Sequence, residues 1–101
     1  MVGLLSKATQ KALTELTGEP RIEVALRITL KDSVEHRLEI IEREAFAFER
    51  KYGMSFEEFK HNWEQGKIFD KYSFEVEKDY WEWEGTISRK KKIEGIEEWL
   101  I

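Results

Sequence analysis

The clearest pattern along this chain is a regular spacing of apolar residues in its middle third. Between positions 34 and 52 they recur in alternating steps of four and three, at Val34, Leu38, Ile41, Ala45, Phe48 and Tyr52. This spacing places side chains on one face of an α-helix and is typical of helices that pack along their length. Gly53 follows the last of them, and glycine commonly ends a helix. The pattern predicts a helix that ends near residue 52.

The residues before this helix permit two interpretations. As a strand, residues 21–30 alternate apolar and polar positions and are rich in β-branched side chains. As a helix, Ile22, Leu26 and Leu30 continue the same face into Val34, and Pro20 suits a first helical turn. Continuity and the proline favour the helix. We therefore predict one helix over about 20–52, with a strand at 21–30 as the alternative.

A second long helix is expected over about 73–99. Ser73 can cap its N-terminus, and the acidic, aromatic stretch 75–85 follows. Its bulky groups fall on two faces, because Tyr80 and Trp83 share one side while Phe74 and Trp81, seven residues apart, share another. A helix with apolar groups on two sides must be covered on two sides. This helix is therefore predicted to be a packing or partner-binding element whose two faces each meet a different neighbour.

Two short helices complete the predicted fold. Helical spacing of apolar residues indicates one over residues 3–16, which ends at Thr17-Gly18. The capping-box pattern Ser55-Phe56-Glu57-Glu58 predicts the start of another, and Gly66 its end. No change in composition marks a linker between domains. We predict a single all-α domain over 1–101, or an α+β domain if the strand alternative holds.

The predicted helix over 20–52 is long for so small a chain. At 1.5 Å per residue it spans roughly 50 Å, whereas a compact domain of about 100 residues has a radius of gyration near 13 Å. The helix must therefore break near Lys31-Asp32-Ser33 or pack against other subunits. Apolar residues away from its main face, Ile40, Phe46 and Ala47, favour the second option. We expect a homo-oligomer with helical interfaces.

Composition excludes some functions. The net charge of -4 and the pI of about 5.3 disfavour nucleic acid as the main partner, since proteins that grip phosphates are usually basic. The chain has no cysteine, hence no disulfide, thiolate nucleophile or cysteine-ligated zinc. No apolar run in residues 1–17 suits a membrane span, so the expected location is cytoplasmic. The abundance of Glu, Lys and Arg resembles proteins from hot environments.

Candidate catalytic and metal-binding residues are few. The serines show no nucleophile-elbow motif, and there is no glycine-rich phosphate loop. Glu58 and His61 have the Glu-x-x-His spacing that di-iron helical bundles use twice, together with two further glutamates. One copy of the motif is more typical of a solvated helix face. We predict no catalytic, cofactor or metal residue, with a metal-dependent enzyme as one alternative.

The leading functional hypothesis is a non-enzymatic protein–protein interaction module. Large aromatic residues anchor many interfaces, and those predicted to contact a partner are Trp63, Tyr80, Trp81 and Trp83. Base stacking by the same residues is disfavoured, because their acidic neighbours would repel phosphates. A ribbon-helix-helix DNA-binding regulator is the other alternative, and it needs residues 21–30 as a strand.

Two stretches resemble a known group of proteins. They are KYGMSFEEF at 51–59 and EVEKDYWEWE at 75–84, followed by Gly85. At this separation they resemble a group of small, mostly uncharacterised archaeal and bacterial proteins, some of which look like antitoxin-type partners encoded beside a small toxin. The resemblance covers about 22–85 and implies helix before the Lys-Tyr-Gly stretch, a protein partner such as a toxin, and no catalytic residues. The β-branched run 22–30 and the tail after Gly85 depart from it.

Overall fold

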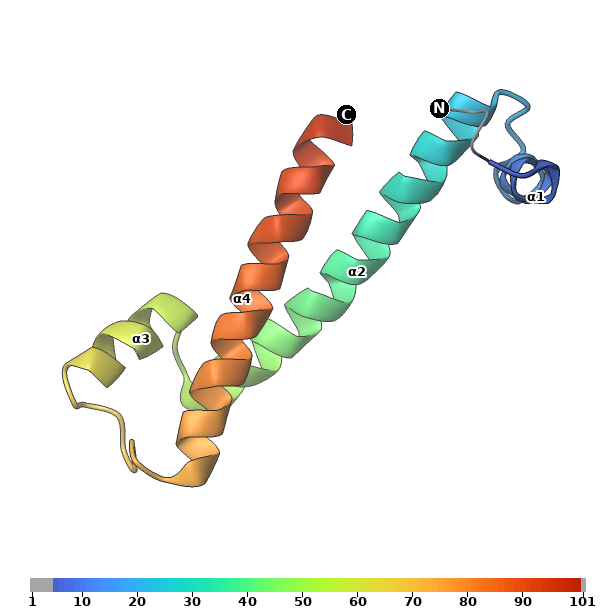
Figure 1. The fold of residues 1–101 in the computed structure, drawn as a ribbon. Helices are drawn as coiled ribbons and strands as arrows, with labels where there is room; N and C mark the ends of the chain where they lie inside the picture. Colours follow the sequence, from blue (N-terminus) through green and yellow to red (C-terminus); the bar gives the residue numbers. More distant parts are fainter. Residues whose placement is uncertain (1–4, 101) are drawn as a thin grey trace.

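The computed structural model describes residues 5–100 of the chain, which fold into helices joined by short connections (Figure 1). The helices are α1 (Lys7–Thr17), α2 (Ile22–Tyr52), α3 (Phe56–Glu64) and α4 (Phe74–Leu100). No strand occurs within residues 5–100, so the predicted all-α fold is confirmed. The two long and two short helices lie where the apolar spacing predicted them. Gly3 and Leu4, at the expected start of the first helix, lie outside the described residues.

The alternative of a strand at 21–30 is wrong, because these residues form the first turns of α2. The physical reason is burial on more than one side. Helix α1 packs against this part of α2 (Figure 1), and Leu13 of α1 and Ala25 of α2 are both buried. Ala25, which interrupts the alternating pattern, is the fully buried residue of this segment. The DNA-binding alternative requires a strand at residues 21–30, and the structure has the start of helix α2 there instead.

Serine caps and glycines set the helix ends. The hydroxyls of Ser6, Ser55 and Ser73 each accept a hydrogen bond from the backbone N–H three residues later, at 3.1 to 3.2 Å. Gly53 follows α2 with φ of 67°, in the left-handed region that favours glycine. Because helix α2 is continuous through residues 31–33, the break considered there does not occur.

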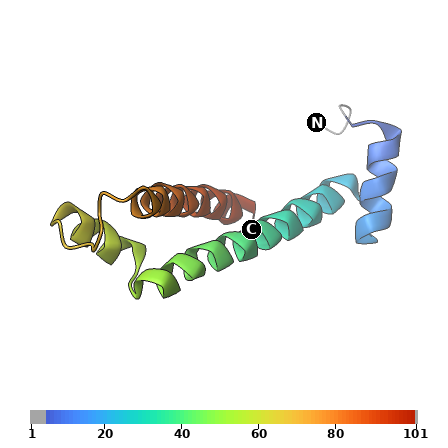
Figure 2. The same cartoon turned by 90° about the horizontal axis from the view of Figure 1, so that it is seen from below.

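Helices α2 and α4 form an antiparallel hairpin, with α3 in the connection between them (Figures 1 and 2). The helices cross near the end where α3 lies, and they diverge toward the opposite end (Figure 1). We call these the closed end and the open end of the hairpin. The molecule measures 56 × 23 × 22 Å with a radius of gyration of 19.5 Å. A compact domain of this length has about 13 Å, so much of each long helix is covered on one side alone.

The core lies at the closed end and is mainly aromatic. Its buried residues are Phe59, Ile68, Tyr80 and Trp83. The Trp83 ring lies 5.2 to 6.0 Å from the rings of four neighbours, Phe48, Tyr52, Phe56 and Phe59. Such ring pairs stabilise a core beyond the effect of the buried area. The closed end therefore has its own complete hydrophobic cluster.

None of the helices within residues 5–100 has the length and apolar character needed to cross a lipid bilayer.

Candidate functional site

The four aromatic residues predicted to bind a partner gather around α3 and α4, but they differ in exposure. Trp83 is fully buried and Tyr80 nearly so, both within the core. Trp63 is half-buried and packs 4.7 Å from the Tyr80 ring. Trp81 is 66% exposed, with its ring edge-on to Tyr80 at 5.4 Å. Trp81 is thus the one of the four that presents a largely open surface.

The two-faced character expected of α4 is visible in this exposure. Tyr80 and Trp83 face the other helices, whereas Phe74 and Trp81 lie on the opposite side and are largely exposed. Trp99, in the last turn of α4, is also 72% exposed. Nothing among residues 5–100 covers this second face. The exposed face of α4 that a partner would contact is therefore separate from the face that packs against the other helices.

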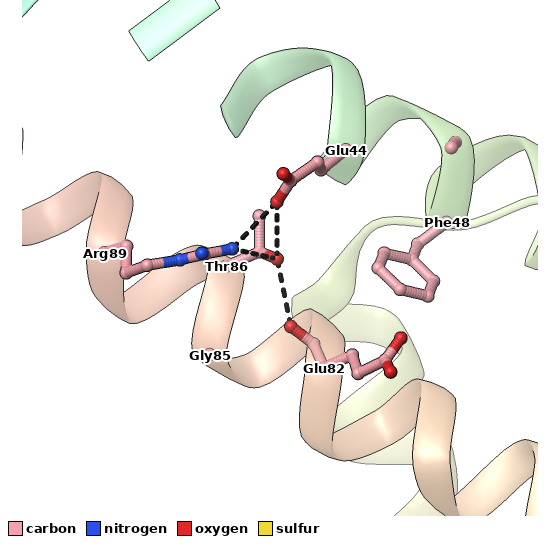
Figure 3. Close-up of a pocket in the computed structure, with 7 residues that line it drawn as sticks. Glu44, Phe48, Glu82, Gly85, Thr86 and Arg89 are labelled. Atoms are coloured by element: carbon pink, nitrogen blue, oxygen red, sulfur yellow. Dashed lines mark hydrogen bonds and ion pairs between the residues drawn. The ribbon is translucent and has the colours of Figure 1, made fainter. Parts of the chain in front are cut away.

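A groove of about 730 Å³ lies between α2 and α4 near the closed end (Figure 3), lined by Glu44, Ala47, Phe48, Glu82, Gly85, Thr86 and Arg89. On one side, the Arg89 guanidinium donates to Glu44 at 2.8 Å and to the Thr86 hydroxyl at 3.2 Å. Thr86 in turn donates to the Glu82 carbonyl at 2.9 Å. The groove combines an apolar surface at Phe48 with an ion pair that links the two helices.

A cluster of polar residues joins the end of α2 to the start of α4, and sequence reasoning missed it. The Lys51 ammonium lies 2.6 Å from Asp79 and 2.7 Å from Glu75. The Tyr52 hydroxyl donates to Asp79 at 2.5 Å. Asp79 itself is buried. We call these four residues the polar clasp. All four belong to the two stretches, 51–59 and 75–84, that the sequence analysis singled out, which was the available signal.

Three residues of the polar clasp, Lys51, Tyr52 and Asp79, have fixed protonation states near neutral pH. Burial and the hydrogen bond to Asp79 raise the pKa of Tyr52, and the bonds to Asp79 and Glu75 raise the pKa of Lys51. Burial opposes ionisation of Asp79, but hydrogen bonds from Lys51 and Tyr52 hold its pKa below the usual value. General acid–base catalysis needs a pKa near the working pH. These groups are instead suited to a permanent ion pair.

Glu58 and His61 are both exposed on α3. Over residues 5–100, no three His, Cys, Asp or Glu side chains come close enough together to hold a metal ion. The Glu-x-x-His pair therefore has no further ligand in the part of the chain that the structure describes.

Comparison with protein families, curated proteins and solved structures gives no match for this chain. The resemblance of 51–59 and 75–85 to the antitoxin-type group accordingly stays a prediction.

Proposed function

We propose that this chain is a non-enzymatic protein–protein interaction module that works as a helical homo-oligomer. The observation that carries the proposal is the set of large apolar side chains exposed on helices whose other face is already packed. On α2 and α4 these are Ile28, Leu30, Ile40, Phe46, Phe74, Trp81, Ile96 and Trp99. Single exposed apolar residues are ordinary, but two long helices that each carry several indicate surfaces that a partner covers.

The shape of the molecule supports the same proposal. Helix α2 has 31 residues; its first turns pack against α1, and the side of its first half that faces the end of α4 borders a groove. In bundles, helices of this length bury their faces against several neighbours. Additional copies of the chain would supply those neighbours. The polar clasp is consistent with a non-enzymatic role, because its Lys51 and Asp79 hold fixed charges at neutral pH.

The mass in solution tests this proposal. We expect sedimentation equilibrium to give a multiple of the 12.1 kDa chain mass at micromolar concentration, with a concentration-dependent return to monomer. A monomer at every concentration up to the millimolar range would contradict the homo-oligomer.

A toxin-type protein partner is the second candidate, and the exposure of Trp81 favours it. An exposed indole that packs edge-on against the buried Tyr80 ring is a rigid anchor of the kind that dominates interface energetics. Co-expression with the product of the neighbouring gene tests it. We expect a complex that co-purifies and that Trp81→Ala weakens at least tenfold, while Phe69→Ala, which removes an exposed aromatic from the loop before α4, leaves it intact. Absence of a complex would remove this candidate.

A further inference from the structure

The open end of the hairpin contains an unfilled apolar groove. It has a volume of about 350 Å³ and lies between the first half of α2 and the end of α4, lined by Val24, Arg27, Ile28, Lys31, Val34, Glu97 and Leu100. Leu30 and Trp99 stand nearby on the same helices and are 44% and 72% exposed. The aromatic core does not reach this end, because its buried members come from α3, α4 and the loop between them. A group from outside must fill the groove if its apolar surface is to be removed from water.

Charged residues on the two helices at this end have matching spacing and opposite signs. Helix α2 carries Glu23, Arg27 and Lys31, four residues apart, in the order negative, positive, positive. Helix α4 carries Lys90, Glu94 and Glu98 at the same spacing, in the order positive, negative, negative. None of the six takes part in an ion pair among residues 5–100. These charges are therefore available to a partner.

The direction of the helices decides which pairing is favourable. Within one chain α2 and α4 run antiparallel, which would set Glu23 beside Glu98 and Lys31 beside Lys90, both repulsive, and only Arg27 beside Glu94 as an attractive pair. A parallel alignment sets Glu23 beside Lys90, Arg27 beside Glu94 and Lys31 beside Glu98, all attractive. One chain cannot supply the parallel alignment. A second copy whose open end overlaps that of the first, turned end over end, can supply it. In each copy α4 runs toward the open end and α2 runs away from it, so α4 of one copy and α2 of the other point in the same direction.

We propose that a second copy of this chain, related by a two-fold axis, docks its open end onto the open end of the first. The α4 helix of each copy lies parallel along the α2 helix of the other, and all three charge pairs form twice, as a self-complementary interface requires. The side of each α4 that carries these charges covers the groove of the other copy, and Trp99, on the opposite side of that helix, lies at the margin of the interface. The inference rests on the proposed self-association and assigns it a surface, an orientation and a register.

Charge reversal tests the register. Arg27→Glu and Glu94→Arg each place like charges together twice in a homodimer, so we expect each variant alone to weaken dimerisation at least tenfold in sedimentation. An equimolar mixture of the two variants should restore the dimer, because every reversed charge then faces an opposite one. As matched controls, Arg43→Glu on α2 and Glu57→Arg on α3 lie outside the open end and should leave dimerisation unchanged. Circular dichroism checks that each variant remains helical.

A second experiment uses the absence of cysteine from the sequence. Mixed Arg27→Cys and Glu94→Cys chains should form a disulfide-linked heterodimer under mild oxidation, whereas Arg27→Cys mixed with Glu57→Cys should not. A dimer that survives both reversals and gives no selective cross-link would overturn this interface while leaving the homo-oligomer proposal intact. A wild-type chain that is monomeric throughout would overturn both.

Discussion

The two ends of the α2/α4 hairpin are built differently. At the closed end, Trp83 is surrounded by four aromatic rings and the polar clasp ties α2 to α4. At the open end the buried residues of α2 are Ala25 and Val34, and the apolar groove is unfilled. The difference indicates that contacts at the closed end stabilise the fold of the single chain, and that the open end is the surface through which chains associate. Variants at the two ends should therefore separate folding from assembly.

The largest effect is expected from Trp83→Ala at the closed end. Removing a fully buried indole leaves a cavity and disrupts four ring contacts, which typically costs about 3–5 kcal/mol of unfolding free energy. Urea unfolding followed by circular dichroism measures it. Trp81→Ala, two residues away on the exposed face, is the matched control and should cost under about 1 kcal/mol. Equal effects of the two variants would contradict the assignment of the core to one face of α4.

The polar clasp should give the next largest effect. Asp79→Asn removes the charge that Lys51 and Tyr52 contact, and we expect a loss of about 1–3 kcal/mol, the usual range for a disrupted buried hydrogen bond to a charged group. Glu75→Gln removes the more exposed partner of Lys51 and should cost less than about 1 kcal/mol. Urea midpoints at pH 7 compare the two variants. A larger loss for Glu75→Gln would show that the exposed carboxylate dominates the clasp.

The polar clasp also predicts a pH dependence of stability. The pKa of Asp79 is lower in the folded protein than in the unfolded chain, so its contribution is complete above the unfolded value of about 3.9. Protons bind the unfolded state preferentially as the pH falls below that value, and the contribution disappears as the pH passes the folded pKa. Urea midpoints between pH 7 and pH 2 should fall more steeply for wild type than for Asp79→Asn. If the urea midpoints of the two proteins fell in parallel with pH, Asp79 would be excluded as the source of the pH dependence.

At the open end, Trp99→Ala should barely change the stability of the monomer, by under about 0.5 kcal/mol, because the indole is mostly exposed. Its effect should appear in association, with the dimer dissociation constant raised several-fold in sedimentation, because Trp99 lies at the margin of the interface. Phe74→Ala, at the closed-end terminus of the same helix, is the control that should leave dimerisation unchanged. A stability loss of several kcal/mol in monomeric Trp99→Ala would place Trp99 in the core of the single chain.

The smallest effect is an expected gain. Gly85 lies within α4, and a Cβ added there meets nothing within 4 Å. Because alanine favours helix interiors over glycine, Gly85→Ala should stabilise the chain by about 0.5–1 kcal/mol, visible as a higher melting temperature. A decrease would mean that the groove beside Gly85 closes during folding or assembly.

Much of the fold could be predicted from local patterns. The spacing from Val34 to Tyr52 and the serine and glycine caps placed the helix ends within a few residues, because both depend on neighbours along the chain. The state of residues 21–30 was harder, since their alternation and β-branched side chains favour a strand, and packing by α1 outweighs that preference.

The candidate sites were less accessible to prediction. The Lys51–Asp79 contact joins residues 28 positions apart, so no local spacing reveals it. Helical periodicity did separate the face of Trp83 from that of Trp81, but it could not say which face the other helices would cover. That choice depends on how α2, α3 and α4 meet in three dimensions.

The placement of the tryptophans has a spectroscopic consequence. Buried indoles emit at shorter wavelengths than hydrated ones. Trp83 is buried in the core at the closed end, and Trp99 is exposed near the groove at the open end. Single-tryptophan variants that retain Trp83 or Trp99, with phenylalanine at the other three sites, would each report on one end. We expect dilution of the assembled protein to shift the emission of Trp99 while that of Trp83 stays constant, and urea to shift both. The hairpin thus contains separate intrinsic fluorophores for assembly and for folding.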